Sequence, residues 1–418
     1  MLVKTILNRC ERFKRFVYGQ VRFVTQAGRD SLEVEVKPRK GSVALCSCCH
    51  QAAPCYDHAS EPRRFEFVPL WGYEVFLVYV MRRVDCPRCG VKIEEVPWAD
   101  GKHQCTKTYM QFLASWARSL SWTEVGRRFQ TSWEKVFHAV EYIVEWGLQQ
   151  RNLDGITAIG VDEIQWKKNH KYLTLVYQIN SGCIRLLWIG KDRTVESFSA
   201  FFDMLGEQRS ALIGHVCSDM WKPYLQVSAQ RVRQAVHILD RFHIVARINK
   251  ALEEVRANEH RRMHAAGREP LLTKARWLLL KRPENLTETQ EPKLRELVRY
   301  NLQSVRAYLL KEEFQLLWTY VSPTWAARFI DRWTTRVMRS RIEPLKREAR
   351  TIRRHKPLIL NWFKAKGAFS SGIVEGLNNK AKLTMRKSYG FRQFKTIEIA
   401  LYHSLGALPE PKITHRFC

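Results

Sequence analysis

The chain has 418 residues, 45% of them hydrophobic, and a net charge of +29 that arises from 70 Lys and Arg against 41 Asp and Glu. The length exceeds that of one simple core and favours two to four folded units, and the composition excludes a disordered chain. Because the cationic excess is spread along the chain, we expect a polyanionic partner. Nucleic acid is the commonest one inside cells, and the alternatives are an anionic membrane surface or a charge that serves only solubility.

No apolar run approaches the roughly 20 residues that cross a bilayer, the best being Val75–Met81. The first residues alternate charged and apolar side chains and lack the apolar core of a signal peptide. We therefore expect a cytoplasmic, nucleoid-associated protein. In that compartment the 11 cysteines serve as metal ligands or buried thiols instead of disulfides.

Residues 1–105 are predicted to form a zinc-binding β module that begins with a helix and a strand. Its alternating segments Arg64–Leu70 and Tyr73–Val84, separated by Trp71 and Gly72, indicate a β-hairpin between two Cys-x-x-Cys pairs. Such pairs can each chelate one side of a tetrahedral Zn²⁺, and backbone amides in the second turn can hydrogen-bond sulfur. The preferred ligands are Cys46, Cys49, Cys86 and Cys89. Cys48 could replace one ligand of the first pair, and the alternative to zinc is a set of buried thiols.

Residues 106–152 show a helical pattern that predicts three helices, at Tyr109–Leu120, Trp122–Phe129 and Ser132 to about Gln150. The join between the last two has the form of a helix-turn-helix, in which Ser132 would cap the final helix. The first turn of that helix would then meet base edges in DNA. The candidate DNA contacts are Arg127, Arg128, Ser132, Trp133 and Lys135.

Residues 153–243 read as three strands followed by alternating helices and strands. The expected order is strands at Ile156–Val161, Tyr172–Asn180 and Ile184–Ile189, a helix at Val195–Leu205, a strand at His215–Cys217, a helix near Tyr224 and a strand at Ala235–Leu239. This is the order of a ribonuclease H-like fold. The fold class is therefore α/β: a ribonuclease H-like core with a large all-α insertion, preceded by the zinc-binding β module and the helix-turn-helix.

The all-α insertion is expected at residues 244–357, with most of its tryptophans in a core. Its end, from Arg336 to Lys356, is rich in cations and favours contact with a phosphate backbone. Residues 358–418 would complete the core with a helix that carries Glu375, followed by a basic tail with interleaved aromatic residues suited to DNA. The candidate DNA contacts there are Lys382, Arg386, Lys387 and Arg392.

Three carboxylates are candidates for one metal site. Asp162 is expected at the end of the first strand of the core, Asp219 follows the fourth strand, and Glu375 lies on the closing helix. Phosphodiester cleavage needs an activated oxygen and charge relief on the leaving group, which two Mg²⁺ (or Mn²⁺) ions held by carboxylates supply. Glu163 and Asp240 are rival ligands, and His243 could act in the site or simply pack.

Several segments together resemble the ISL-three family of bacterial insertion-sequence transposases. They are Gly160–Glu163, Ser218–Tyr224, Asp240–His243, Gly372–Lys382 and Tyr389–Phe394, together with the paired Cys-x-x-Cys motifs and the helix-turn-helix. The resemblance covers nearly the whole chain. One departure is Cys48, which stands where a small residue is commoner.

The resemblance implies a DDE transposase that binds the terminal inverted repeats of its element, cleaves the ends and joins them to target DNA. Its catalytic triad falls on Asp162, Asp219 and Glu375, and a homodimer on double-stranded DNA is implied by the resemblance alone. Two alternatives remain open. One is a non-catalytic DNA-binding regulator on the same scaffold, and the other is a structure-specific nuclease.

Overall fold

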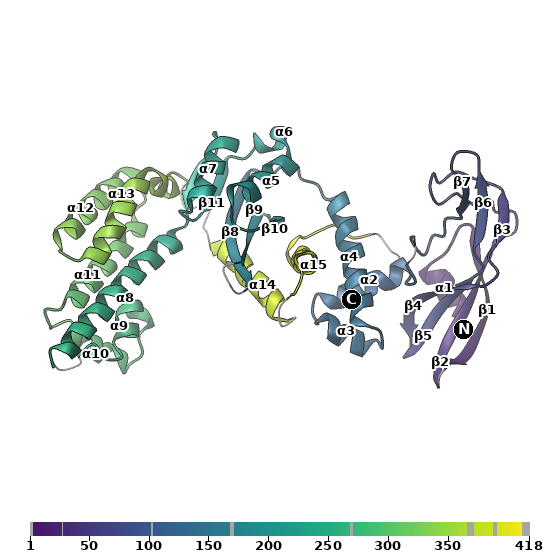
Figure 1. Ribbon diagram of the computed structural model, residues 1–418, viewed down its shortest axis with the longest axis horizontal. Helices are drawn as coiled ribbons and strands as arrows, with labels where there is room; N and C mark the ends of the chain where they lie inside the picture. Colours follow the sequence, from purple (N-terminus) through teal and green to yellow (C-terminus); the bar gives the residue numbers. More distant parts are fainter. Residues whose placement is uncertain are drawn as a thin grey trace. The chain divides into compact units, whose positions relative to one another are not determined.

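The computed structural model describes residues 3–26, 28–101, 103–167, 171–267, 271–365, 372–387 and 391–411. The chain forms two compact units (Figure 1). The first comprises residues Met1–Asn152 together with Leu383–Cys418, and the second comprises Leu153–Lys382. The division falls after Asn152, and the last residues of the chain belong to the first unit.

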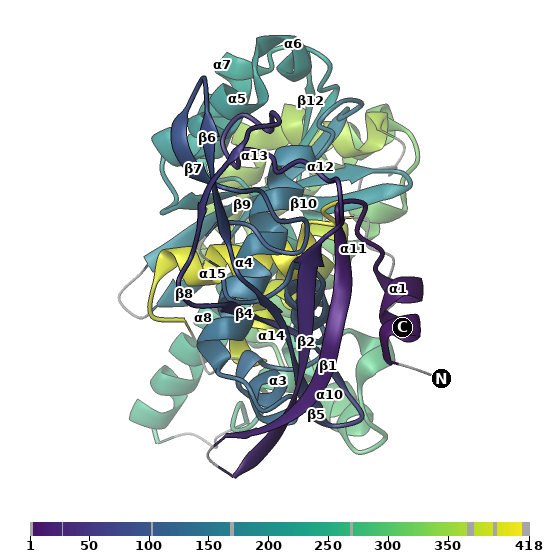
Figure 2. The ribbon, with the colours of Figure 1, turned by 90° about the vertical axis from the view of Figure 1, so that its right-hand side faces the viewer.

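The first unit begins with a β region built on two sheets (Figures 1 and 2). Its elements are α1 (Val3–Cys10), β1 (Phe16–Gln26), β2 (Arg29–Pro38), β3 (Cys55–His58), β4 (Arg63–Leu70), β5 (Tyr73–Tyr79), β6 (Arg82–Cys86) and β7 (Gly90–Ile93). The larger sheet has the order β1-β2-β5-β4 and the smaller one β3-β6-β7. Trp71 and Gly72 both have positive φ, of 51° and 89°. They form the two-residue turn that the twist of an antiparallel hairpin favours, and the predicted hairpin is confirmed as β4 and β5.

Helices α2 (Lys107–Ala117), α3 (Trp122–Arg128) and α4 (Trp133–Gln150) follow. Ser121 and Ser132 cap α3 and α4 by accepting the backbone N–H groups of Glu124 and Lys135. The predicted cap at Ser132 is confirmed. The C-terminal helix α15 (Phe394–Leu405) also packs in this unit, against α4.

The second unit is organised around a five-stranded sheet of order β10-β9-β8-β11-β12. Its strands are β8 (Ala158–Lys167), β9 (Lys171–Asn180), β10 (Cys183–Lys191), β11 (His215–Ser218) and β12 (Val236–Leu239). The first three pair antiparallel, and β11 pairs parallel with both β8 and β12. Helices α5 (Val195–Leu205) and α7 (Lys222–Arg231) bury the apolar residues of one face, among them Ile159 and Val161 of β8. A short helix, α6 (Glu207–Ser210), follows α5.

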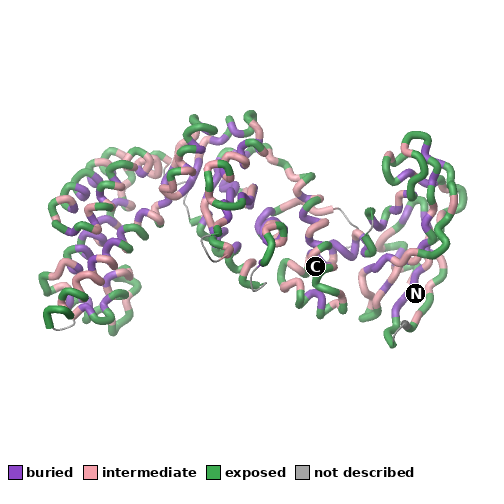
Figure 3. Tube along the Cα trace, viewed as in Figure 1, coloured by how far each residue is buried: buried purple, intermediate pink, exposed green. Residues whose placement is uncertain are grey.

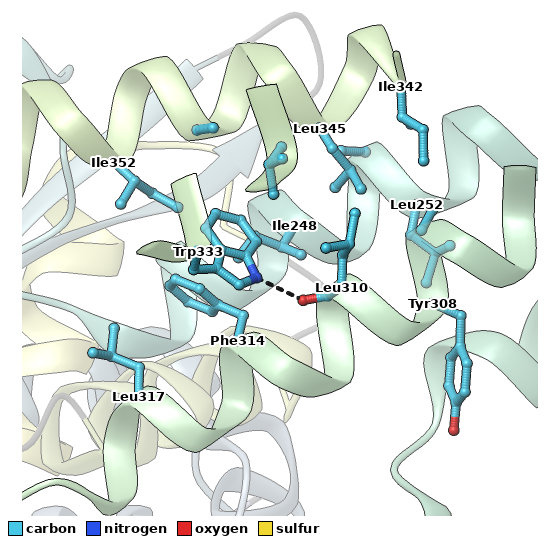
Figure 4. Packing of buried hydrophobic residues seen from close by; sticks show 14 of the residues in the cluster. Ile248, Leu252, Tyr308, Leu310, Phe314, Leu317, Trp333, Ile342, Leu345 and Ile352 are labelled. Atoms are coloured by element: carbon cyan, nitrogen blue, oxygen red, sulfur yellow. Dashed lines mark hydrogen bonds between the residues drawn. The ribbon is translucent and has the colours of Figure 1, made fainter. Parts of the chain in front are cut away.

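A helical region separates β12 from the last helix of this unit. It contains α8 (Arg241–Ala265), α9 (Arg276–Leu280), η1 (Pro283–Asn285), α10 (Gln290–Leu297), α11 (Gln303–Gln315), η2 (Leu316–Thr319), α12 (Pro323–Arg339) and α13 (Glu343–Lys364). Buried residues line the inner faces of these helices (Figure 3). At their centre the indole N–H of Trp333 donates to the carbonyl of Leu310 at 2.8 Å (Figure 4). The predicted insertion is therefore all-α. It was expected to end at residue 357, but α13 continues through Pro357.

Helix α14 (Gly372–Lys387) follows, and the division between the two units falls within it. Among the described residues, no helix combines the length and the apolar character needed to span a bilayer.

Candidate active site and cysteine cluster

Three aspartates lie at one level of the parallel part of the sheet in the second unit. Cys217 of β11 is paired with Gly160 of β8, so Asp219 is level with Asp162, two residues further along both strands. By the same register Asp240, after β12, is level with Asp219. The carboxyl ends of adjacent parallel strands thus bring together acids that are far apart in the sequence. Asp162 itself lies within β8, paired with Leu175, and its predicted place at the end of the strand is wrong.

Helix α14 lies against β8 because residue 160 is a glycine. A Cβ at Gly160 would overlap the Cγ2 atom of Val374. The side chain of residue 162 points to the same face of a strand as that of residue 160. Asp162 therefore faces α14, the helix that carries Glu375.

Asn378 of α14 connects the helix directly to Asp162. Its Nδ2 donates to Oδ2 of Asp162 at 2.6 Å, and its Oδ1 accepts the hydroxyl of Tyr177 at 2.7 Å. Tyr177 and Asn378 are both buried. The backbone N–H of Glu163 donates to the other oxygen of Asp162 at 2.8 Å. Both carboxylate oxygens are thus held by donors, an arrangement that suits the ionised form.

Burial opposes that ionisation. It raises the pKa of Asp162 to about 7. The charge of His243 lowers this pKa, whereas the charges of Glu163 and Asp219 raise it further. Burial and then the charge of Glu163 likewise raise the pKa of Asp219 to about 6. Oδ1 of Asp219 accepts the backbone N–H of Trp221 at 2.8 Å. Carboxyl groups crowded in this way are stabilised as anions by a cation.

His243 and Asp240 complete the cluster from the start of α8. Nε2 of His243 lies 4.0 Å from Asp162 and 3.7 Å from Asp240. Asp240 caps α8 by accepting the N–H of Phe242 at 2.7 Å. His243 therefore lies beside both Asp162 and Asp240, and one role of Asp240 is to begin a helix.

Glu163 points to the opposite face of β8, where Oε1 pairs with Arg193 at 2.9 Å. Its other oxygen, Oε2, is buried with no hydrogen-bond partner among the residues that the structure describes. The oxygen-rich donor set of this region fits a hard divalent cation.

Glu375 occupies the first turn of α14 and is exposed. It precedes Asn378 by three residues, so its Cβ lies about 5–6 Å from that of Asn378 along the helix. Its carboxylate does not form, with those of Asp162 and Asp219, a group whose ligand atoms all lie within 4.8 Å of one another. Within the described parts of the chain, only four cysteines form so close a group of three or more potential ligands.

Those cysteines are Cys46, Cys49, Cys86 and Cys89 of the first unit, and their sulfur atoms all lie within 4.8 Å of one another. The second pair stands in the turn between β6 and β7, where the N–H of Arg88 donates to the sulfur of Cys86 and lowers the pKa of that thiol to about 7. The neighbouring Cys48 is exposed and lies close enough to Cys89 to hydrogen-bond it, which raises the pKa of the Cys89 thiol. Four converging thiols with one acidified member have the donor chemistry of a structural zinc site.

Some of the predicted DNA contacts in the first unit line one groove of about 780 Å³. Arg127 and Trp133 reach it from α3 and α4, and Lys387 and Arg392 reach it from the C-terminal segment. Trp133 is 49% exposed although it lies in the first turn of a helix. A groove that combines cations with an exposed indole has the chemistry expected for nucleic acid.

The other predicted contacts are placed differently. Ser132 is engaged as the cap of α4, and the ammonium group of Lys135 pairs with Glu66 at 2.6 Å. Arg128 ends α3 with an exposed side chain, and Lys382 and Arg386 are exposed on α14. Lys387 also donates to the carbonyls of Arg118 and Ser119 at the end of α2.

Sequence reasoning missed Asn378 and Tyr177. Helical spacing could have indicated Asn378, one turn after Glu375. The pairing of Tyr177 opposite Gly160 depends on the register of β9, which the sequence alone does not fix.

The sequence is similar to those of known proteins. Residues 159–401 match the transposase model of the ISL3 (ISL-three) family, and residues 42–89 match the zinc-finger model of the IS204/IS1001/IS1096/IS1165 transposases. The transposase for insertion sequence element IS1557, from two strains of Mycobacterium tuberculosis, is 31% identical over 408 residues, which cover 91% of this chain and 90% of the relative. The transposase for insertion sequence element IS1001 of Bordetella parapertussis is 29% identical over 399 residues, covering 94% of this chain and 96% of the relative.

Proposed function

The chain belongs to the ISL3 family of DDE transposases, and we propose that it binds the terminal inverted repeats of its insertion sequence, cleaves the ends and joins them to target DNA. The observation that carries the catalytic part is the alignment of Asp162, within β8, with Asp219, just after the parallel strand β11, while α14 is held against β8. The strand order, three antiparallel strands followed by two parallel ones, supports a ribonuclease H-like core.

The proposed metal ligands are Asp162, Asp219 and Glu375. A pair of Mg²⁺ or Mn²⁺ ions, when bound, would activate the attacking oxygen and offset charge on the leaving oxygen. Asn378 holds the carboxylate of Asp162 in a fixed orientation, and Val374 seats α14 against Gly160. To share a metal pair with the two aspartates, Glu375 would have to approach them by rotation of its exposed side chain.

The first unit is proposed to read the DNA ends. Zinc bound by Cys46, Cys49, Cys86 and Cys89 would fix the turn between β6 and β7. Helices α3 and α4 have the order and capping of a helix-turn-helix, with Arg127, Arg128 and Trp133 available to DNA. Lys387 and Arg392 line the same groove as Arg127, and Arg386 adds an exposed cation on α14. Lys382, the last residue of the second unit, is proposed as a further contact. Lys135 would contact DNA only after leaving Glu66.

The proposal is tested with a DNA fragment that carries one terminal inverted repeat and its flank. Wild-type protein with Mg²⁺ should yield a cleaved end and, with target DNA, a strand-joined product. Asp162→Asn, Asp219→Asn and Glu375→Gln should abolish both products while retaining binding. Asp203→Asn is the matched control, because Asp203 is an exposed aspartate of the same unit.

The outcome separates the alternatives. Binding without cleavage by the wild type would favour a DNA-binding regulator. Cleavage without a strand-joined product, on branched DNA as well as on the repeats, would favour a structure-specific nuclease. A homodimer on DNA and a cytoplasmic, nucleoid-associated location remain parts of this proposal, and the mass of the complex in solution tests the former.

A further inference from the structure

An open groove of about 1140 Å³ lies between α11 and α12 in the helical region of the second unit. Four arginines of α12 line it, at positions 328, 332, 336 and 339, and Arg306 faces them from α11. Spacings of four, four and three residues place the four arginines of α12 on one face of the helix. The groove is therefore lined by a stripe of guanidinium groups, named here the arginine stripe.

The core of the helical region fixes this stripe in place. On its opposite face α12 buries Phe329, Ile330, Trp333 and Val337. The hydrogen bond from Trp333 to the carbonyl of Leu310 ties α12 to α11, as Figure 4 shows. The arginines therefore project from a rigid surface and not from a loop.

Most of the stripe lacks an acidic partner. Arg336 pairs with Glu313 at 2.9 Å, and Arg328 lies over the ring of Trp325. Arg306, Arg332 and Arg339 are exposed and form no ion pair with any residue that the structure describes.

The neighbouring helix α13 differs, although its sequence is equally basic. Lys346 and Arg350 pair with Glu343, Arg347 pairs with Glu254, and Lys356 pairs with Asp331. Arg353 donates to the hydroxyls of Thr334 and Thr335. Four cations of α13 are therefore paired with acids of the helical region, and Arg353 is hydrogen-bonded. Arg354 of α13 forms no ion pair with a described residue, so the basic face predicted from Arg336 to Lys356 is only partly paired.

The geometry suits a nucleic-acid backbone. At about 1.5 Å per residue, the stripe from Arg328 to Arg339 spans roughly 16 Å along the helix axis, which corresponds to about five phosphates of one strand at ~3.4 Å each. Guanidinium groups bind phosphate oxygens in pairs. The lining also includes Glu313 and Asp331, but Glu313 pairs with Arg336, and Asp331 pairs with Lys356 of α13. Arg306, Arg332 and Arg339 therefore remain without an acidic partner among the described residues.

We propose that the arginine stripe binds the sugar–phosphate backbone of duplex DNA without regard to base sequence. The proposal rests on the proposed function in that DNA is the substrate. It adds a second DNA-binding surface, in the helical region, to the groove of the first unit. Because the contacts are to phosphates, they change affinity for all sequences alike.

The test uses the full-length protein and a 30-base-pair duplex of unrelated sequence, with the dissociation constant measured across a range of KCl concentrations. Each lost phosphate contact lowers the slope of log affinity against log salt by about 0.9. The triple variant Arg306→Gln, Arg332→Gln, Arg339→Gln should therefore lose about 2.7 from the slope and bind roughly 100-fold more weakly at 0.15 M salt. The corresponding Lys variants should recover most of the slope, because they restore the charge.

The matched control is Arg261→Gln, Arg295→Gln, Arg299→Gln, which removes the same charge from exposed arginines of the same helical region outside the groove. It should change the slope by less than half a unit. An unchanged slope in the stripe variant, or an equal loss in the control, would overturn the proposal. Thermal unfolding of both variants should match the wild type, since all six side chains are exposed.

The experiment distinguishes failure of this proposal from failure of the proposed function. A stripe variant that loses its slope on unrelated DNA supports the second surface even if the wild type fails to cleave terminal repeats. Conversely, cleavage of the repeats by a wild type whose slope does not depend on the stripe would retain the transposase and remove this surface.

Discussion

Replacing Asp219 by Asn should stabilise the protein in the presence of a chelator at alkaline pH. Burial and Glu163 raise the pKa of Asp219 to about 6, roughly two units above the ordinary aspartate value. The folded state therefore holds this proton more tightly than the unfolded state does. The stability that Asp219 contributes is fully present below about pH 4 and is lost as the pH rises through 6.

Two units correspond to about 3 kcal/mol at ~1.4 kcal/mol per unit. An asparagine keeps the hydrogen bond that Oδ1 accepts from Trp221 and cannot ionise. For a unit of the size of Leu153–Lys382, about 3 kcal/mol raises the unfolding temperature by roughly 6–12 °C. The gain should be greatest at pH 8, about half as large at pH 5, and absent below about pH 4.

Thermal unfolding in EDTA, followed by circular dichroism at several pH values, measures this difference. Asp203→Asn is the control, because it removes an exposed aspartate paired with Arg231 and should change stability by no more than about 0.5 kcal/mol. Mg²⁺ should then raise the unfolding temperature of the wild type more than that of Asp219→Asn. A variant that unfolds at or below the wild-type temperature at pH 8 would refute the electrostatic account of this site.

Three further predictions concern other parts of the chain. Gly160→Ala should lower the free energy of unfolding by about 1–3 kcal/mol and reduce cleavage, because its Cβ overlaps Val374. Adding Val374→Ala should recover much of this loss in thermal unfolding. Strictly additive effects of the two substitutions would argue against the contact. Cys86→Ser should eliminate the one zinc ion expected per chain, whereas Cys48→Ser should retain it, as metal analysis of the purified protein can decide. Ser132→Ala should lower the free energy of unfolding by about 1 kcal/mol, because α4 loses its cap, and Ser132→Thr should lower it much less. Denaturant unfolding measures both.

Local signals in the sequence predicted many elements closely. The helix expected at Val195–Leu205 has these bounds because Thr194 caps it and Gly206 follows it. The hairpin at Trp71 and Gly72 is specified by a turn that needs two positive φ angles. In both cases the decisive interactions join residues that are close in the chain.

Predictions failed where distant residues decide the outcome. The apolar run that begins β8 stops at Val161, yet the strand continues to Lys167 because β9 pairs with it throughout. The all-α insertion was expected to end at residue 357, but α13 continues through Pro357 to Lys364, since Ile352 and Phe363 on either side of the proline are buried in the core. The partners of the basic residues in α13 could not be inferred for the same reason.

The surroundings of Asp162 indicate why a buried carboxyl that weakens the fold would be retained. The hydroxyl of Tyr177 and the carboxylate of Asp162 together fix the amide of Asn378, so that its NH₂ group faces Asp162. The N–H of Glu163 donates to the other oxygen. The O–H of a protonated Asp162 would therefore compete with an N–H donor at whichever oxygen carried the proton. The hydrogen bonds thus favour the anion while burial disfavours it, and a divalent cation would relieve this conflict. Because the pKa of Asp162 is raised to about 7, burial outweighs these hydrogen bonds in the metal-free protein. The hydrogen bonds therefore orient the carboxyl group for a metal, and a bound cation would offset the cost of its ionisation.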